Sequence, residues 1–296
     1  MHIPSAMIEG TVCPVTAVVA TAGVATALWA ASKAESKPTA SRFAAVSAMV
    51  FAAQMINFPV QFGTSGHLLG GVLASVLLGT PFGVLSMSLI LAVQSLIFSD
   101  GGLAVLGTNI LNMALLGAGV GGWLAGSIRS RSLSTFARVG IASWASVLLA
   151  ALACSIELSI SGVTSFYQSA PMMLSVHALI GIGEALLTVA AVALLPSAET
   201  GNRMETVVPA TAALVIALVL SPFASGLPDG LEWVAASLGF LHDSAPAFAA
   251  PLSGYSFPGV SVLSTSLAGA TGVVAVFVLG NILASLWDRR AAVSRS

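Results

Sequence analysis

The first two residues, Met1 and His2, carry the sharpest chemistry in the sequence. The α-amine of Met1 and the amide nitrogen of His2 close a five-membered ring around a metal ion. That amide and the imidazole Nδ1 close a six-membered ring. Once the amide is deprotonated, three nitrogens lie in one plane, which suits Ni(II) or Cu(II). We therefore expect a retained Met1 and a planar chelate that needs a fourth nitrogen, the alternative being an ordinary solvated terminal histidine.

Histidine is scarce, and the chain holds four, at His2, His67, His177 and His242. His67 follows a glycine-rich stretch and is expected on the same side of the membrane as the N-terminus, so it is the natural fourth ligand. The glycines beside it let the backbone approach a ligand closely. Asn57, Thr64 and Ser65 are expected to orient the two imidazoles as hydrogen-bond partners.

The elements that must position these residues are membrane helices. Hydrophobic residues make up 57% of the chain and charged residues 7%, with a mean hydropathy of +0.99, whereas soluble domains carry about 25% charged residues. The apolar runs have the length of bilayer-crossing helices and lack the alternation of barrel strands. We predict an all-α integral membrane protein of the cell membrane with about nine spans, at residues 11–32, 43–59, 67–80, 83–98, 103–127, 138–160, 172–196, 206–222 and 264–287.

The basic residues orient these spans. All ten Lys and Arg residues follow the first, fifth, seventh or last predicted span, which places them on one face. An excess of Lys and Arg marks cytoplasmic loops. The N-terminus is therefore predicted outside and the C-terminus inside. The opposite segments hold Glu9, Asp229, Glu232 and Asp243 without any Lys or Arg.

The chain is predicted to contain two modules. Residues 1–200 carry seven spans and would form the metal-binding part, whereas residues 201–296 carry two spans around an external loop at 223–263. Long loops in compact proteins are usually functional or disordered. Asp229, Glu232 and His242 lie in this loop and are candidates for a loop or coupling role, with a solvated histidine as the favoured reading of His242.

Two further candidates lie inside a predicted span. His177 and Glu184 are seven residues apart, so they share one helical face. An ionisable residue within a membrane span is a functional hypothesis by default. For both residues we favour a structural or coupling role over direct metal binding.

Several motifs together resemble the CbiM/NikM family, the substrate-binding (S) components of energy-coupling factor transporters, a type of ABC transporter, for cobalt and nickel. They are Met-His-Ile-Pro at 1–4, Asn-Phe-Pro-Val at 57–60, Gly-Thr-Ser-Gly-His-Leu-Leu-Gly-Gly at 63–71 and the segment 93–103. Pro-Asp-Gly-Leu-Glu at 228–232 is similar to the small companion subunit NikN, here fused to the C-terminus. Ser5 departs from the Asp that many relatives carry after Met-His-Ile-Pro, but that Asp would not be a ligand.

The resemblance implies a metal bound by the Met1 amine, the His2 amide and imidazole, and the His67 imidazole. It implies uptake of Ni(II) or Co(II) as the transported substrate, without catalysis or an organic cofactor. The fused companion favours nickel. Because the sequence has no Gly-x-x-x-x-Gly-Lys-[Ser/Thr] loop, ATP hydrolysis would belong to cytoplasmic ATPase partners, joined through a transmembrane (T) subunit. The external loop is expected to insert toward the metal site.

A rival hypothesis comes from Gly63-Thr-Ser-Gly66, which matches the Gly-x-Ser-Gly pattern of rhomboid intramembrane proteases. Ser65 would be the nucleophile and His177 its base. Four residues of which three are small match often by chance in a chain rich in Gly and Ser, so this reading is the alternative. A membrane scaffold without a ligand is a third.

Overall fold

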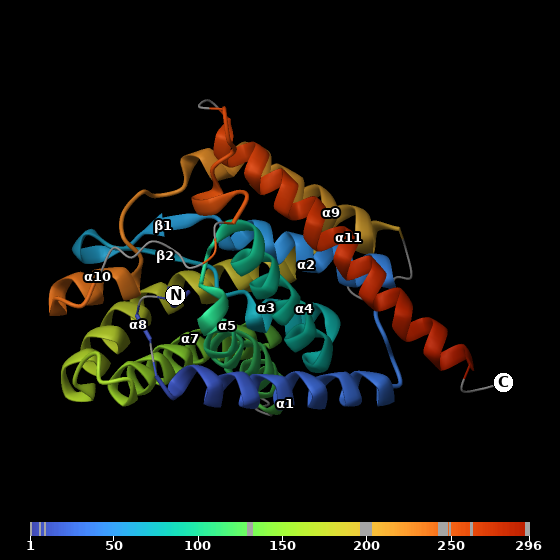
Figure 1. The fold of residues 1–296 in the computed structure, drawn as a ribbon. Helices are drawn as coiled ribbons and strands as arrows, with labels where there is room; N and C mark the ends of the chain where they lie inside the picture. The colour runs from blue at the N-terminus through green and yellow to red at the C-terminus, as the bar shows by residue number, and fades with distance from the viewer. Residues whose placement is uncertain are drawn as a thin grey trace.

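The protein is mostly helical, with one small sheet at one end (Figure 1). The computed structural model describes residues 2–5, 7–8, 10–128, 133–195, 203–241, 248, 250–260 and 263–293, the last seven as backbone alone. The helices are α1 (Val12–Lys33), α2 (Ala40–Gln54), α3 (Gly71–Leu78), α4 (Thr80–Val93), α5 (Leu106–Asn109), α6 (Gly121–Ser127), α7 (Thr135–Ile160), α8 (Phe166–Leu194), α9 (Met204–Val215), α10 (Gly230–Leu238) and α11 (Ser264–Val293). Wider π-helical turns extend three of them, at Gln94–Phe98, Ile110–Val120 and Ile216–Leu220.

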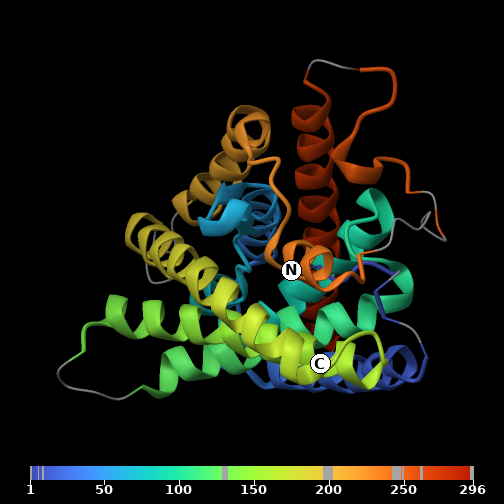
Figure 2. The ribbon, with the colours of Figure 1, turned by 90° about the vertical axis from the view of Figure 1, so that its left-hand side faces the viewer.

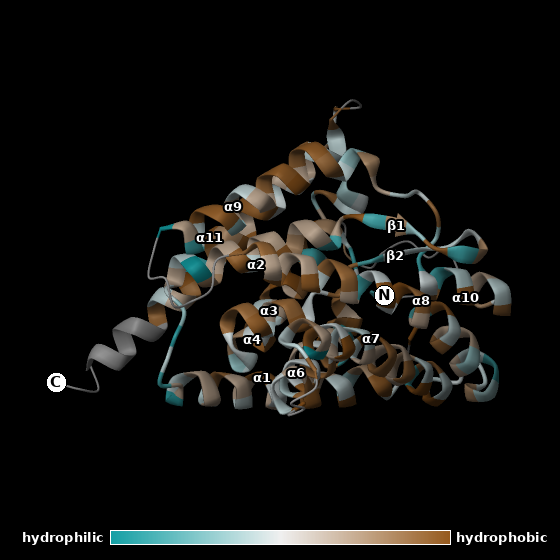
Figure 3. Cartoon of the chain, turned by 180° about the vertical axis from the view of Figure 1, so that it is seen from behind, coloured by the Kyte–Doolittle hydropathy of each residue, from teal (hydrophilic) through white to brown (hydrophobic). Residues whose placement is uncertain are grey.

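Seven helical stretches among the described residues are long and apolar enough to cross a membrane. They are Val12–Lys33, Thr80–Phe98, Leu103–Ser127, Thr135–Ile160, Phe166–Leu194, Met204–Phe223 and Ser264–Leu286. Seven of the nine predicted spans coincide with them. Large apolar side chains remain exposed along these helices, and Figure 3 shows the hydrophobic colouring that runs along α9. The chain is therefore a multi-pass membrane protein; the orientation of its ends stays a prediction.

The other two predicted spans, 43–59 and 67–80, contain helices that are too short. The first holds α2, of 15 residues, and the second holds α3, of eight, whereas a span needs about 20 residues. The α2 helix ends because the chain turns into a strand at Asn57. Gly70 and Gly79 flank α3 with φ values of 78° and 93°, a backbone that favours glycine and ends the helix on both sides. Twelve of the fifteen residues of α2 are buried, so this helix lies in the core, packed by α9, α11, α3 and α4.

A β-hairpin joins α2 to α3, which the all-α prediction missed. Strand β1 (Asn57–Pro59) pairs antiparallel with β2 (Ser65–His67), and Asn57 lies opposite His67. The connecting turn places Phe62 and Gly63 at φ values of 65° and 71°. The hairpin therefore delivers His67 at the end of a strand rather than at the start of a helix.

The C-terminal module adds an edge to this hairpin. The Ser65 N–H donates to the Pro228 C=O at 2.8 Å, and the Ser225 N–H donates to the Asn57 C=O at 2.7 Å. Asp229 forms a parallel bridge with Ser65. It then begins α10 with a capping box, since its side chain accepts from the Glu232 N–H while Glu232 accepts from the Asp229 N–H. The predicted irregular loop thus contains a helix, and α10 packs against α8 (Figure 2).

An ion pair ties the same module to the core near the other end of α2. Arg42 Nη1 donates to Glu205 Oε2 at 2.7 Å, and Arg42 Nη2 donates to the Leu77 C=O at 2.9 Å. The two charged side chains are only 5% and 11% exposed. Helices α9 and α11 lie along α2 in Figure 1, so residues on both sides of the predicted module boundary share one core.

We predict that Arg42→Met destabilises the protein by about 3–5 kcal/mol, because it leaves a buried carboxylate without its cationic partner. The double variant Arg42→Met/Glu205→Met should recover most of the loss, since an apolar pair of similar volume is often neutral. Thermal unfolding in detergent measures both. A single variant as stable as the wild type would contradict this account of the ion pair.

Candidate metal site

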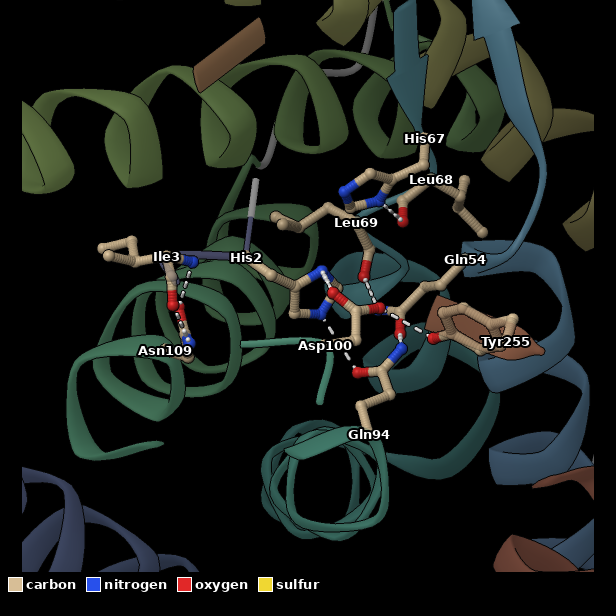
Figure 4. Close-up of polar contacts among 10 residues, drawn as sticks. All are labelled: His2, Ile3, Gln54, His67, Leu68, Leu69, Gln94, Asp100, Asn109 and Tyr255. Carbon is tan, nitrogen blue, oxygen red and sulfur yellow. Dashed lines mark hydrogen bonds and ion pairs between the residues drawn. The ribbon is translucent and has the colours of Figure 1, made fainter. Parts of the chain in front are cut away.

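The imidazoles of His2 and His67 stack on each other, although 65 positions of chain separate them. Their ring centroids lie 5.3 Å apart with an interplanar angle of 20° (Figure 4). His2 is buried at 9% exposure, and His67 is half-buried. Met1 lies outside the described residues. The structure thus brings together the two histidines that the sequence singled out as metal ligands.

An asparagine holds the backbone next to His2. The Ile3 N–H donates to Asn109 Oδ1 at 2.9 Å, and Asn109 Nδ2 donates back to the Ile3 C=O at 3.1 Å. Asn109 ends α5 and is buried, as is Ile3. The Asn109 side chain thus binds both backbone polar groups of Ile3, as a neighbouring β-strand would, and fixes the N-terminal segment. Nothing in the sequence assigns this role to Asn109, because its partner lies 106 positions away.

Among the described residues, Gln94 and Asp100 approach the two nitrogens of the His2 ring (Figure 4). Its Nε2 lies 3.0 Å from Gln94 Oε1, and its Nδ1 lies 3.3 Å from Asp100 Oδ1. Tyr255, from the C-terminal module, donates its hydroxyl to the other oxygen of Asp100 at 2.7 Å. The segment 93–103 that holds Gln94 and Asp100 supported the family resemblance, but nothing in its spacing assigned these roles.

His67 is held through its own ring and through the backbone that follows it. Its Nδ1 lies 3.0 Å from the Leu68 C=O and donates to it, which makes Nε2 the acceptor nitrogen. Glu184 on α8 accepts from the N–H of Leu69 at 2.6 Å and of Gly70 at 3.0 Å. Both oxygens of Glu184 therefore anchor the connection from β2 to α3, which supports a structural role for this residue.

Enclosure by the surrounding protein disfavours a charge on either imidazole. Burial lowers the pKa of His67 to about 3 and also lowers the pKa of His2. Only a neutral imidazole has a lone pair for a metal ion. Both rings are consequently ready to bind a cation at neutral pH without first losing a proton.

The three predicted supporting residues contact the C-terminal module rather than the imidazoles. The Thr64 hydroxyl donates to the Pro228 C=O at 3.0 Å, and the Ser65 hydroxyl donates to the Leu227 C=O at 2.7 Å. Asn57 pairs with His67 through the hairpin backbone. These residues therefore dock residues 225–229 beside the site, and the expectation that they orient the rings through side-chain hydrogen bonds is not met in the described contacts.

The same contacts argue against a serine protease. Ser65 is fully buried and its hydroxyl is engaged with backbone carbonyls. The Nδ1 of His177 donates to the Met173 C=O of its own helix at 2.8 Å. Among the described residues no hydrogen bond joins Ser65 to His177, so the structure gives the predicted rhomboid-like dyad no support.

A cavity of about 700 Å³ opens onto the two imidazoles. Three carboxylates line it, from Asp100, Asp229 and Glu232, and none of the described lining residues is Lys or Arg. A cleft lined by one sign of charge concentrates counter-ions and speeds their entry. This vestibule would attract a divalent cation toward His2 and His67.

His177 lies near His67 at a second cavity. The two histidines, Asp229 and Gly230 line a small separate cavity. A Cβ atom placed on Gly230 would lie 2.8 Å from the His177 ring and 2.9 Å from Ile180. The predicted His177 thus packs against the docked α10 capping box. His242 falls outside the described residues.

The fold and site define a multi-pass membrane protein with two stacked, neutral imidazoles facing an acidic vestibule, an arrangement suited to a transition-metal cation. The similarity of the chain to known protein families agrees with this assignment. The family model for the cobalt uptake substrate-specific transmembrane region, CbiM, matches residues 2–200. A PDGLE domain model matches residues 203–289. The chain belongs to the CbiM family and carries a C-terminal PDGLE domain.

Curated relatives carry transport names. A chain of Archaeoglobus fulgidus provisionally named a fused nickel transport protein, NikMN, is 36% identical over 81% of this chain and 84% of its own length. The fused nickel transport protein NikMN of Rhodobacter capsulatus is 36% identical over 40% of this chain and 35% of its own. A crystal structure of a transition metal transporter aligns with a TM-score of 0.59 and 29% identity, over 66% of this chain and 92% of the other.

Gly230→Ala tests how tightly the capping box docks. The new methyl group meets His177 and Ile180 closer than van der Waals contact allows, and overpacking of this kind costs about 1–3 kcal/mol. Hydrogen exchange of the Ser65 amide, which donates to Pro228, should speed up by about 5- to 150-fold if that cost falls on the docked state.

The matched control is Gly226→Ala, because nothing lies within 4 Å of a Cβ atom at that position. It should leave exchange at Ser65 unchanged. Equal exchange in the two variants would show that α10 does not depend on this close approach.

Proposed function

We propose that the chain captures Ni(II), with Co(II) as the second choice, as the substrate-binding subunit of an energy-coupling factor transporter. The observation that carries the proposal is the stacking of His2 on His67 at 5.3 Å. It brings a terminal chelating residue and a distant imidazole to one point below an acidic vestibule. Membership of the CbiM family and the names of its relatives point to the same substrates.

The proposed coordination uses nitrogens alone. The Met1 amine, the His2 amide and the His2 Nδ1 would form the two fused chelate rings, and His67 would supply the fourth nitrogen through Nε2. The anchoring of Ile3 by Asn109 and of Leu69 by Glu184 holds the two contributing segments in place. Four nitrogens in a plane suit Ni(II), which also binds nitrogen ligands more tightly than Co(II) does.

The fused module would serve loading. Its segment 225–232 docks on the hairpin that bears His67 and brings Asp229 and Glu232 to the vestibule. Its Tyr255 holds Asp100 beside His2. A cation drawn in by these carboxylates would reach the imidazoles with little further travel, so the module acts as part of the entrance.

In this proposal the N-terminus and the vestibule lie outside and the C-terminus lies in the cytoplasm, the side that the Lys and Arg residues predict. A separate transmembrane (T) subunit and cytoplasmic ATPases would supply the energy for release. The chain itself would bind and transport, without catalysing a reaction.

Metal analysis of protein purified with an untagged N-terminus tests the coordination. Wild-type protein should retain nickel, and nickel should displace cobalt in competition, in line with the order of stability of their nitrogen complexes. Adding residues ahead of Met1 should abolish binding, because the α-amine becomes an amide. His67→Ala should abolish it too, because the plane loses its fourth nitrogen.

The matched control is His177→Ala, which removes an imidazole from the adjacent cavity but leaves every proposed ligand. It should still bind metal. Retained binding in the N-terminally extended protein, or its loss in the wild type, would refute the chelate.

Removal of the loop tests the role of the fused module. Replacing residues 224–262 with a short Gly-Ser linker deletes the docking segment and should greatly reduce nickel uptake by cells. His242→Ala, within the same loop, should leave uptake intact. Uptake that survives the deletion at equal protein levels would show that loading does not need the loop.

A further inference from the structure

Two buried glutamines connect His2 to the backbone just beyond His67. Gln94 Oε1 lies 3.0 Å from His2 Nε2, and Gln94 Nε2 donates to Gln54 Oε1 at 2.9 Å. Gln54 Nε2 in turn donates to the Leu69 C=O at 2.7 Å. Gln94 is fully buried and Gln54 is 5% exposed, so water does not compete for these bonds. Figure 4 shows the chain of contacts from ring to carbonyl.

The hydrogen bonds from His2 through Gln94 and Gln54 form a relay that ends at the Leu69 carbonyl. This last acceptor fixes the direction of every bond in the relay. A backbone carbonyl can only accept, so Gln54 must turn its NH₂ group toward Leu69. The oxygen of Gln54 then faces Gln94, which must donate through its own NH₂ group. The oxygen of Gln94 is thereby left facing His2, and it too can only accept. The ring nitrogen that meets it, Nε2, must therefore carry a hydrogen.

We propose that Gln54 and Gln94 are positioning residues that select the Nε2–H tautomer of His2 and so leave the lone pair on Nδ1. The six-membered chelate ring that begins at the His2 amide can close only through Nδ1. The other tautomer would put a hydrogen where the metal ion must bind. This inference rests on the proposed function for its consequence, but the tautomer itself is a property of the metal-free protein.

Among the described contacts, Asp100 is the other side chain that approaches a nitrogen of this ring, and it does not reverse the assignment. Its Oδ1 lies 3.3 Å from His2 Nδ1, beyond the usual range of about 2.7–3.2 Å for a hydrogen bond from nitrogen. Its Oδ2 already accepts from Tyr255. The shorter contact, at Nε2, belongs to Gln94.

The relay also joins the two halves of the site. Leu69 accepts from Gln54 through its C=O and donates its N–H to Glu184. Leu69, whose N–H is anchored by Glu184, thus also sets the direction of the amides that lead to His2 through its carbonyl. A displacement of Leu69 would weaken these hydrogen bonds, and His2 could then adopt either tautomer.

Nitrogen-15 NMR of metal-free protein with labelled histidine tests the assignment directly. The chain has only four histidines, and single His→Gln variants at 67, 177 and 242 assign the remaining signal to His2. We expect wild-type His2 to show a protonated Nε2 and an unprotonated Nδ1. Protonation mainly at Nδ1 would overturn the proposal.

Variants of Gln94 separate tautomer selection from packing. Gln94→Met keeps the volume but removes the acceptor, so His2 should show both tautomers and nickel affinity should fall by about 10- to 100-fold, as for other partners of metal ligands. Gln94→Glu still accepts from Nε2–H and should keep the wild-type tautomer. Loss of that tautomer in Gln94→Glu, or its persistence in Gln94→Met, would contradict selection by this residue.

Gln54→Met tests the relay at a distance, since residue 54 does not touch the ring in the described contacts. It frees the Gln94 amide to turn, so a second His2 tautomer should appear. Gln61→Met, at an exposed position in the hairpin turn, is the matched control and should change nothing. An unaltered His2 signal in Gln54→Met would refute the relay.

If wild-type protein binds no nickel, the proposed function fails while the tautomer assignment is still decided by NMR.

Discussion

The site depends on how the backbone after His67 satisfies its polar groups. Leu69 and Gly70 lie between a strand and a helix, so neither element pairs their N–H groups, and burial forbids water. Glu184 accepts from both N–H groups, and Gln54 donates to the Leu69 carbonyl. This junction is thereby tied to α8 and α2 at once. Removing either partner would leave a buried backbone group unsatisfied at the base of the hairpin that carries His67.

The fused module acts on the same hairpin from its other edge. Ser65 and Asn57 form backbone hydrogen bonds with Pro228 and Ser225, as a third strand would. The hairpin is short, and a two-stranded hairpin alone is marginally stable. Docking therefore supplies order to His67 as well as carboxylates to the vestibule. The Arg42–Glu205 ion pair fastens the module at a second point. Helices α9 and α11 can therefore stay packed on α2 when the segment docked on the hairpin changes.

Hydropathy was enough to find seven spans, because a run of about 20 apolar residues seldom forms anything other than a transmembrane helix. It failed at 43–59 and 67–80, where apolar residues continue although the backbone turns at Asn57 and at Gly70. The sequence also pointed to the proposed ligand pair, since the chelate rings at His2 depend on residue type alone and His67 is one of only four histidines. Gln54, Gln94 and Asn109 could not, because their partners lie 15 to 106 positions away along the chain and no spacing reveals such contacts. The Gly-x-Ser-Gly match at Ser65 suggested only the unfavoured protease alternative, and the sequence could not reveal that the hydroxyl bonds to the distant Leu227 carbonyl.

Neutral amides suit the place where this relay runs. A carboxylate at position 94 would also accept from His2, yet a buried anion is costly unless a cation pairs with it. Glutamine directs the proton at no such cost, and hydrogen bonds of neutral groups strengthen where the dielectric is low. The negative charges stay instead at the vestibule, on Asp100, Asp229 and Glu232, where a cation in transit can balance them. Under the proposed function, these carboxylates would attract the ion, and the uncharged amides of Gln54 and Gln94 would orient the His2 ring.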